Sequence, residues 1–314
     1  MHHFNCLRLT ALHASRFTLH VSRFTLHASR FTFCALCLLT ACTTLPELDD
    51  ENAVYYWRTE WRLDSLEREW VAHYDIHKVY CRYFDVVIDE DDDNEPYPNA
   101  TISFVDSVPS DLEIIPTVYI TEACMHQPHK GMAEKLVKRI VQMNETHDVM
   151  GVKEIQIDCD YTLRSRQTYY DFLEEVRREA ALHQLRLSTT IRLHQLSMPV
   201  PPVDYGVLMI YNTGDPQKFE ERNPILDLRD VQPYLHYLDD YQLPLAAAYP
   251  VYEWLRTISG VHITHEVEAD EILNVKSAVE AERDDLRHTI LLYHLDADNI
   301  QRYENETFDA IYCH

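Results

Sequence analysis

From about residue 54 to residue 314, segments with the pattern of β-strands alternate with segments with the pattern of α-helices. Such alternation indicates a parallel sheet built from βα units. We expect eight strands, at 54–59, 78–87, 114–121, 152–160, 186–194, 205–212, 245–249 and 289–294. Helices are expected at 64–73, 130–143, 165–183, 231–241 and 275–287. Eight strands with helices between them predict a single-domain α/β fold, a closed (β/α)8 TIM-like barrel.

The first 41 residues differ from the rest of the chain in charge. They contain four arginines, no lysine and no acidic residue, and an apolar run, 31–41, follows the last arginine. Basic residues, a short apolar run and small residues before a cut site are typical of a secretory signal peptide. The run is too short to span a bilayer, which needs about 20 apolar residues. We therefore expect residues 1–41 to be a signal peptide.

The end of this segment, Leu39-Thr40-Ala41-Cys42, resembles the lipobox of bacterial lipoproteins. The resemblance implies cleavage before Cys42 and lipid on that cysteine, and two or three acyl chains anchor a protein stably to a membrane. Residues 42–53 would then be a lipidated tether and residues 54–314 the barrel domain. The expected location is the bacterial cell envelope, with the outer membrane favoured and the leaflet open. The alternative is an uncleaved apolar N-terminus.

Composition limits the partners and cofactors. The chain has 52 acidic and 28 basic residues, a formal net charge of −24. Such a charge repels nucleic acid, so no nucleic-acid partner is expected. The sequence contains no P-loop, no GxGxxG and no GxSxG motif, and its cysteines lack zinc-type spacing, so we expect no cofactor and no metal. A metal site from His194, Asp158 and His294 is a weaker alternative, and the oligomeric state stays open.

The fourth expected strand carries polar residues on one side. A period of two places Gln156, Asp158 and Asp160 on one face and apolar residues on the other. The apolar face would contact the helix layer, so the carboxylates would face the barrel interior. Neighbouring carboxylates raise each other's pKa, which can provide both an acid and a base. The structural alternative is an aspartate pair bonded to neighbouring strands.

The fifth expected strand repeats this asymmetry. Ser188, Thr190, Arg192 and His194 share one side of it. Buried polar groups cost stability unless they are bonded, so a polar interior on two adjacent strands exceeds what an inert core needs. Arg192 is placed to pair with the carboxylates of the fourth strand, for structure or for function. His194 lies at the strand end, where it could contact a substrate.

Two strand ends resemble those of chitinase-type glycoside hydrolases. That family carries Asp-x-x-Asp-x-Asp-x-Glu on its fourth strand and Met-x-Tyr-Asp on its sixth. Asp158 and Asp160 match the second and third acids, and Tyr211 matches the tyrosine. Ile155, Asn212 and Thr162 replace the first acid, the sixth-strand aspartate and the catalytic glutamate. A threonine cannot protonate the leaving oxygen, so any missing acid must come from another strand end.

Strand-end residues therefore supply the candidate site. The catalytic candidates are Asp158, Asp160 and Glu122, and Asp85 and Glu253 could also supply a carboxylate. Aromatic residues that could stack on a sugar are Trp57, Tyr161, Tyr211, Tyr249 and Trp254. The expected substrate-binding residues are Arg82, Asp85, Arg192, His194, Tyr211, Asn212 and Tyr249.

A closer resemblance spans nearly the whole mature chain after Cys42. Segments such as Tyr56-Trp57-Arg58, Arg82-Tyr83-Phe84-Asp85 and Tyr211-Asn212-Thr213-Gly214 are similar to a family of bacterial lipoproteins of unknown function that are presumed barrels. This resemblance implies fold and export but no reaction. Three hypotheses follow: a membrane-anchored glycoside hydrolase-like enzyme, a non-catalytic glycan-binding lipoprotein, and a structural lipoprotein of the cell envelope.

Overall fold

The computed structural model describes residues 48–88, 95–214, 222–258 and 261–314. The expected signal peptide 1–41, the expected lipidation site Cys42 and the tether up to residue 47 lie outside the described residues. Among the described residues, no helix has the length and apolar character that crossing a membrane requires.

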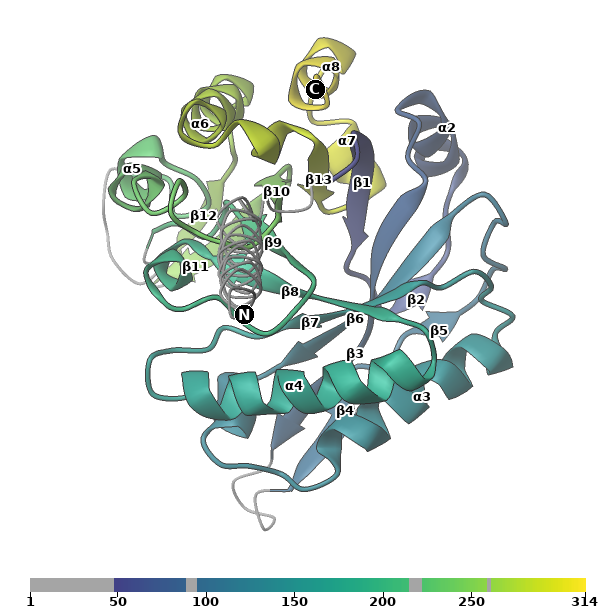
Figure 1. Cartoon of the computed structure of the whole chain (residues 1–314). Helices are drawn as coiled ribbons and strands as arrows, with labels where there is room; N and C mark the ends of the chain where they lie inside the picture. The colour runs from purple at the N-terminus through teal and green to yellow at the C-terminus, as the bar shows by residue number, and fades with distance from the viewer. Residues whose placement is uncertain (1–47, 89–94, 215–221, 259–260) are drawn as a thin grey trace, which may run out of the picture. The chain divides into compact units, whose positions relative to one another are not determined.

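Eight parallel strands among the described residues form a closed barrel, which confirms the expected fold class (Figure 1). The barrel closes because β1 pairs in parallel with both β13 and β3. Each remaining strand pairs with its neighbours in the order β13, β10, β9, β8, β7, β6 and β3. The strands are β1 (Glu51–Tyr56), β3 (Lys78–Ile88), β6 (Glu113–Ile120), β7 (Glu154–Asp158), β8 (Arg186–Arg192), β9 (Tyr205–Met209), β10 (Leu245–Pro250) and β13 (Thr289–Tyr293).

The first strand begins earlier than the sequence pattern indicates. Glu51 already pairs with Thr289 of β13, so the barrel extends into residues that we expected to belong to the tether 42–53. The polar residues Glu51 and Asn52 lie at the N-terminal rim, where the Glu51 carboxylate forms an ion pair with Lys78. The apolar pattern begins only at Ala53, so it does not reveal that Glu51 and Asn52 already pair with β13.

Helices surround the barrel and cover its outer face (Figure 1). The capping box at Asp64, which exchanges hydrogen bonds with Glu67, starts the first of them. The connection from β8 to β9 contains only the 3-10 turn η2 (Leu193–Ser197). The α-helices are α2 (Ser65–His73), α3 (Met132–Thr146), α4 (Arg166–Leu182), α5 (Leu228–Leu235), α6 (Ala269–Glu282), α7 (Ala297–Ile300) and α8 (Asn305–Ile311).

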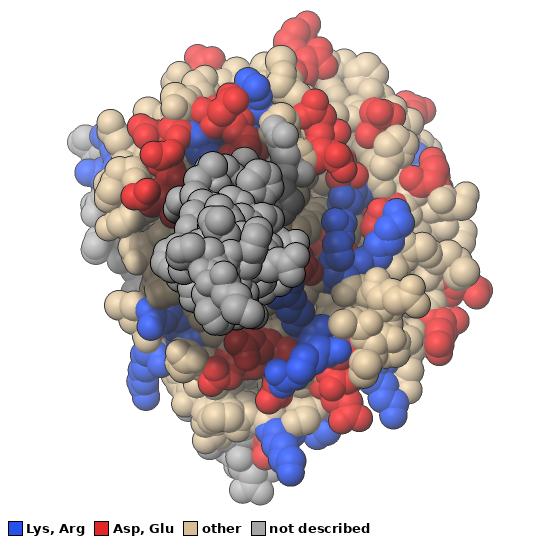
Figure 2. Space-filling view, in the orientation of Figure 1, with Lys and Arg blue, Asp and Glu red and all other residues tan. Residues whose placement is uncertain are grey.

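Short strands extend the loops outside the barrel. The strand β4 (Pro96–Asn99) pairs antiparallel with the end of β3. The pair β11 (Trp254–Ile258) and β12 (Val261–His265) forms a hairpin after β10. The remaining pair is β2 (Glu60–Trp61) with β5 (Ser103–Phe104). On the face shown in Figure 2, acidic and basic side chains are interspersed.

The apolar residues divide into two cores, as alternation along the strands requires. The outer core lies between the barrel and the helices and includes Ile155, Ile157 and Cys159 of the fourth barrel strand. The inner core fills the barrel and contains Ala53, Tyr55, Tyr80, Ile115, Tyr205, Val207, Met209, Tyr211, Ala246, Ala248 and Leu291. Because Ile155 and Ile157 point outward, Gln156 and Asp158 point inward, as the sequence predicts.

A bulge in β3 changes which side chains face the interior. The pairing of β3 with β6 shifts register between Arg82 and Phe84. Tyr83 and Phe84 both pack in the outer core, so the extra residue restores the inward direction at Asp85. Arg82 and Asp85, three positions apart, therefore share one face and form a two-pronged ion pair.

Candidate functional site

Polar side chains on β7 and β8 form a ladder inside the barrel. Near the bottom, the buried Glu154 accepts hydrogen bonds from Ser188 Oγ at 2.6 Å and from the Tyr205 hydroxyl at 2.5 Å. One step higher, Gln156 Oε1 accepts a hydrogen bond from the Tyr55 hydroxyl at 2.8 Å. These bonds satisfy Glu154 Oε1 and Gln156 Oε1, whereas Glu154 Oε2 lies 3.5 Å from Arg186 Nη2.

The ladder ends at the C-terminal mouth with two carboxylates and one guanidinium. Asp158 accepts a hydrogen bond from Thr190 Oγ1 at 2.6 Å and lies 3.6 Å from Arg192 Nη2. Arg192 Nε donates to Asp160 Oδ1 at 2.5 Å. Only 4% of the Asp158 side chain is exposed, whereas 48% of the Asp160 side chain is exposed. Asp158 therefore belongs to the barrel interior, and Asp160 faces the opening.

Arg192 joins the carboxylates to an aromatic ring. Its guanidinium carbon lies 5.5 Å from the centroid of the Tyr211 ring, within the range of a cation–π contact. Its Nη1 atom is buried and has no hydrogen-bond partner among the described residues. Arg192 therefore keeps one donor that no described residue uses.

Burial and charge act in opposite directions on Asp158. Burial raises the pKa of Asp158 above its usual value, and the nearby Asp160 raises it further, while Arg192 and the hydrogen bond from Thr190 lower it. For Arg192, burial lowers the pKa, but Asp158 and Asp160 outweigh this effect and hold the guanidinium charged. Arg192 is thus a permanent counter-ion in the mouth.

Glu122 lies beside the position at which the chitinase-type motif carries its catalytic glutamate. It begins the 3-10 turn η1 (Glu122–Met125) after β6. Glu122 Oε1 accepts hydrogen bonds from Thr162 Oγ1 at 2.7 Å and from Ser165 Oγ at 2.8 Å. Thr162 therefore holds a carboxylate that comes from the neighbouring strand.

The surroundings of Glu122 favour its ionised form. Partial burial raises the pKa of Glu122, but hydrogen bonds from Thr162 and Ser165 and the nearby His126 outweigh burial and hold the pKa below its usual value. An ionised carboxylate accepts protons or hydrogen bonds and does not donate a proton. In this arrangement Glu122 is suited to the role of base or hydrogen-bond acceptor.

Aromatic rings from four strand ends form a cluster at the mouth. Tyr211 and Tyr293 stack with ring centroids 4.6 Å apart. Trp57 lies 5.6 Å from Tyr293, and Tyr252 lies 5.5 Å from Tyr293 on centroids. Arg82 stands over Trp57, with its guanidinium carbon 5.6 Å from the ring centroid. The cluster offers flat apolar faces next to charged groups.

A cavity opens beside these residues. It measures about 250 Å³, close to the lower end of the sizes typical of small-molecule sites. The charged pair Asp160 and Arg192 forms one side of it. The remaining lining residues are Leu193, His194, Met209, Tyr211, Asn212, Thr213 and Tyr234.

The structure brings most of the expected site residues to the mouth. Arg82 and Asp85 pair on β3, and Asp160, Arg192 and Tyr211 line or border the cavity. His194 lies in the turn η2 rather than on the strand, which ends at Arg192, and it also lines the cavity. Asn212 lines the cavity and accepts a hydrogen bond from the Tyr252 hydroxyl at 2.6 Å.

Tyr249 does not reach the mouth. Its side chain is fully buried in the outer core, because Ala246 and Ala248 take the inward positions of β10. Tyr161 is likewise buried in the outer core, where it stacks on Tyr169. Both positions argue against the sugar-stacking role that we expected for these residues.

Two aromatic residues of the mouth were missing from the sequence-based candidates. Tyr293 ends β13, two residues after the inward-facing Leu291, so the period of two could have identified it. Tyr252 follows β10, outside any regular pattern, and only its contact with Tyr293 reveals it. Among the described residues, no three His, Cys, Asp or Glu side chains are grouped closely enough to hold a metal ion.

The barrel has the fold of chitinase-type glycoside hydrolases. Solved structures with this fold include a chitinase from Bacteroides thetaiotaomicron, with a TM-score of 0.55 and 12% identity over 83% of this chain and 93% of the other. A chitinase from Chromobacterium violaceum has a TM-score of 0.52 and 13% identity, over 83% of this chain and 98% of the chitinase. The spore cortex-lytic enzyme SleL of Bacillus megaterium has a TM-score of 0.51 and 12% sequence identity, over 80% of this chain and 72% of the enzyme. No protein-family model and no curated protein sequence matches the chain.

Proposed function

We propose that this barrel binds a carbohydrate at the C-terminal mouth of its strands. The observation that carries the proposal is the aromatic cluster around Tyr211 and Tyr293, which lies directly beside Asp160 and Arg192. A sugar ring has an apolar face that stacks on aromatic rings and hydroxyl groups that bond to carboxylates and guanidinium groups. Parallel barrels place their sites at this end of the strands. The solved structures that share this fold include chitinases, which supports the same ligand class.

The electrostatics of the mouth favour binding over hydrolysis. Cleavage of a glycosidic bond needs a carboxylic acid that protonates the leaving oxygen. Thr162 replaces the acid of the family motif, and the pKa of Glu122 is held below its usual value. The Asp160 carboxylate is already engaged by the guanidinium of Arg192, whose Nε donates a hydrogen bond to it. We therefore propose a glycan-binding barrel as the principal function.

A glycoside hydrolase is the second candidate, and one contact favours it. The hydrogen bond from Thr162 to Glu122 keeps a carboxylate next to the motif position of the catalytic acid. A ligand that displaced the Thr162 and Ser165 hydroxyls from Glu122 would remove the hydrogen bonds that lower its pKa. Glu122 could then donate a proton, with Asp158 and Asp160 beside the reacting sugar.

We also propose that the protein is exported and anchored to the bacterial envelope by lipid on Cys42, most simply at the outer membrane. The arginine-rich start, the short apolar run and the Leu39-Thr40-Ala41-Cys42 sequence support this proposal. Metabolic labelling with an alkyne fatty acid tests it. Labelling should be lost in Cys42→Ser, and persistent labelling of that variant would refute attachment at this residue.

The glycan proposal is tested with the purified protein and a broad glycan panel. Thermal shift identifies ligands, calorimetry measures their affinity, and mass spectrometry detects cleavage products. We expect at least one glycan to bind without being cleaved. Tyr293→Ala and Asp160→Asn should each weaken binding at least tenfold, because they remove a stacking face and a hydrogen-bonding carboxylate.

Matched controls distinguish the outcomes. Asp171→Asn removes a carboxylate from the exposed side of α4 and should leave binding unchanged. Products that disappear in both Glu122→Gln and Asp160→Asn would replace the binding proposal by the hydrolase. Complete absence of ligands would overturn both proposals and favour a structural role for the carboxylates.

A further inference from the structure

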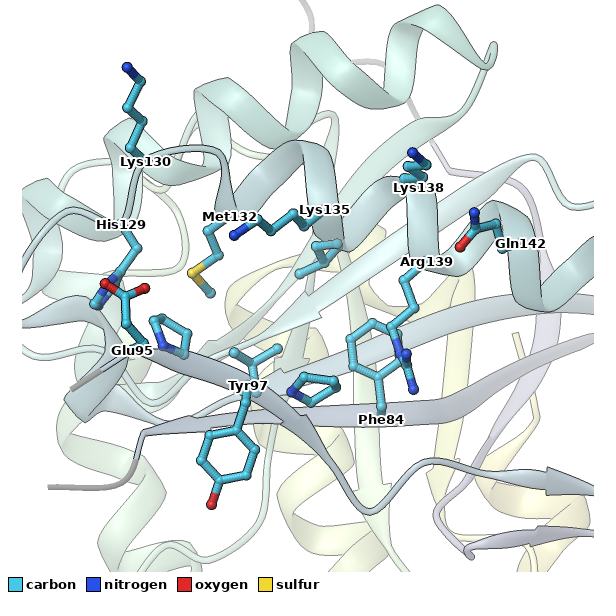
Figure 3. Close-up of a pocket in the computed structure, with 14 residues that line it drawn as sticks. Phe84, Glu95, Tyr97, His129, Lys130, Met132, Lys135, Lys138, Arg139 and Gln142 are labelled. Atoms are coloured by element: carbon cyan, nitrogen blue, oxygen red, sulfur yellow. The ribbon is translucent and has the colours of Figure 1, made fainter. Parts of the chain in front are cut away.

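A second cavity lies outside the barrel wall, between β4 and α3 (Figure 3). It measures about 330 Å³, which is within the range of small-molecule sites. None of the residues that line it also lines the cavity at the mouth. Any ligand of this cavity would therefore bind independently of the proposed glycan site.

The floor of the cavity is apolar. Phe84 and Val86 of β3 and Met132 and Leu136 of α3 contribute to it, and each of these side chains belongs to the outer core. Tyr97 and the prolines on either side of it form the wall on β4, and Tyr97 is 44% exposed. The apolar part of a ligand that covered this floor would remove apolar surface from water, which favours binding.

The rim of the cavity is basic. Lys130, Lys135, Lys138 and Arg139 line it, and among the described lining residues Glu95 supplies the one carboxylate. None of these four cations forms an ion pair with any residue that the structure describes, although acidic residues outnumber basic residues 52 to 28 in the chain. Elsewhere in the barrel, arginines such as Arg82 and Arg192 are paired with carboxylates. Within the described part of the chain, the rim thus gathers four cations that have no carboxylate partner.

Two nitrogen atoms at the cavity also lack partners. Arg139 Nη2 donates to Thr101 Oγ1 at 3.0 Å, and its guanidinium carbon lies 5.1 Å from the centroid of the Phe84 ring. Arg139 Nε and His129 Nε2 are buried, yet neither has a hydrogen-bond partner in the part of the chain that the structure describes. Figure 3 shows His129 at one end of the cavity and Arg139 at the other. Buried polar groups are normally bonded, so Arg139 Nε is a donor that lacks an acceptor among the described residues, whereas the role of His129 Nε2 depends on its tautomer.

We propose that this cavity binds a small amphipathic anion, an aromatic or alkyl body that carries a carboxylate. The body covers Phe84, Met132 and Leu136, and the carboxylate accepts hydrogen bonds from the lysines of α3 and from Arg139. A carboxylate bonded to lysine or arginine forms stronger hydrogen bonds than a neutral acceptor does. The acidic surface of the chain elsewhere makes this cavity the favoured place for such an anion.

Three matched probes test the proposal by titration calorimetry of the purified protein. The first is 2-naphthoate, the second is its neutral counterpart 2-naphthalenemethanol, and the third is acetate. We expect 2-naphthoate to bind with one-to-one stoichiometry and the neutral alcohol to bind at least tenfold more weakly. Acetate lacks the apolar body and should not bind measurably.

The variant Lys135→Gln/Lys138→Gln locates the site. It should weaken 2-naphthoate binding at least tenfold and leave the alcohol unaffected, because it removes charge and retains the apolar floor. The control Lys153→Gln removes an exposed lysine that pairs with Glu113 at the N-terminal end of the barrel strands. Neither residue lines the cavity, so this variant should leave binding unchanged. Melting temperatures of both variants verify the fold.

Three results would overturn the proposal. Equal affinity for the acid and the alcohol would show that the cations are not used. Equal affinity of the double variant and the unchanged protein for 2-naphthoate would place the probe elsewhere. Failure of every probe to bind would also overturn it.

Discussion

Thr162 Oγ1 donates a hydrogen bond to Glu122 Oε1 at 2.7 Å, which joins the loop after β7 to the turn after β6. The motif position that carries an acid in chitinase-type enzymes thus holds a hydroxyl group that bonds to a carboxylate from the next strand. A carboxylate, that of Glu122, therefore still lies at the mouth. Its pKa is held below the usual value, because the Thr162 hydroxyl stabilises the charged form.

The first prediction concerns this hydrogen bond. Thr162→Val conserves the shape of the side chain but removes the donor, so the pKa of Glu122 should rise toward its usual value. A carboxyl-carbon NMR titration measures the change. Thr146→Val is the control, because Thr146 bonds only to the carbonyl of Gln142 in its own helix. An unchanged pKa in Thr162→Val would show that Ser165 and His126 suffice.

The two aspartates of the mouth should differ in their effect on stability. Asp158→Ala removes a buried carboxylate and leaves Thr190 and one side of Arg192 without a partner. Loss of one member of a buried ion pair costs about 3 kcal/mol or more. Asp160 is half exposed, so Asp160→Ala should cost about 1 kcal/mol or less. Denaturant unfolding measures both, and equal losses would refute the distinction between interior and opening.

Glu154 should make stability depend on pH. Burial raises the pKa of Glu154 in the folded state, although hydrogen bonds from Ser188 and Tyr205 lower it in part. The folded state then binds the proton more tightly than the unfolded state. This contribution is fully present below the unfolded pKa and is lost as the pH rises through the folded pKa.

Glu154→Gln isolates that contribution. The melting temperature of the unchanged protein minus that of Glu154→Gln should decrease from about pH 4 to neutral pH. The effect has this sign because only the unchanged protein carries the titrating group. Scanning calorimetry at several pH values checks it, and a difference that grows with pH would contradict the raised pKa.

A larger residue in place of Gly206 of β9 should destabilise the fold. A Cβ atom at this position would lie 2.8 Å from Ile191 Cγ1 and 3.0 Å from methyl groups of Leu243 and Leu245. Gly206→Ala should therefore destabilise the fold by about 1–3 kcal/mol. In Gly206→Ala/Ile191→Ala the loss should be smaller than the sum of the single losses, since the clash is relieved. Additive losses would show that the backbone absorbs the extra methyl group.

Local patterns in the sequence are sufficient to predict the barrel. Side chains alternate with a period of two along any strand, so the inward positions of Gln156, Asp158, Thr190 and Arg192 follow from the strand itself. All eight expected strands are present, and their bounds differ by a few residues at the ends. The difference matters most at β1, which begins at Glu51. The polar residues Glu51 and Asn52 do not follow the apolar pattern, so the sequence does not reveal this start.

Only the tertiary structure decides which residues meet at the mouth. Trp57, Tyr211, Tyr252 and Tyr293 come from strand ends far apart in the chain, and barrel closure brings their rings together. The bulge that turns Asp85 toward Arg82 depends on how β3 pairs with β6, and the sequence pattern of β3 alone does not reveal it.

Contacts between distant segments also explain why the sequence did not predict the direction of the Tyr249 side chain or the protonation of Glu122. A tyrosine at a strand end looks suitable for a sugar site, but the side of the barrel that it faces depends on the phase of the strand, and Tyr249 faces outward. The protonation of Glu122 depends on hydroxyl groups about 40 residues away in sequence. The sequence by itself therefore determined the strands and their polar faces, because these are properties of neighbouring residues. The tertiary structure decided the charges and contacts of the site, because these act through space between distant segments.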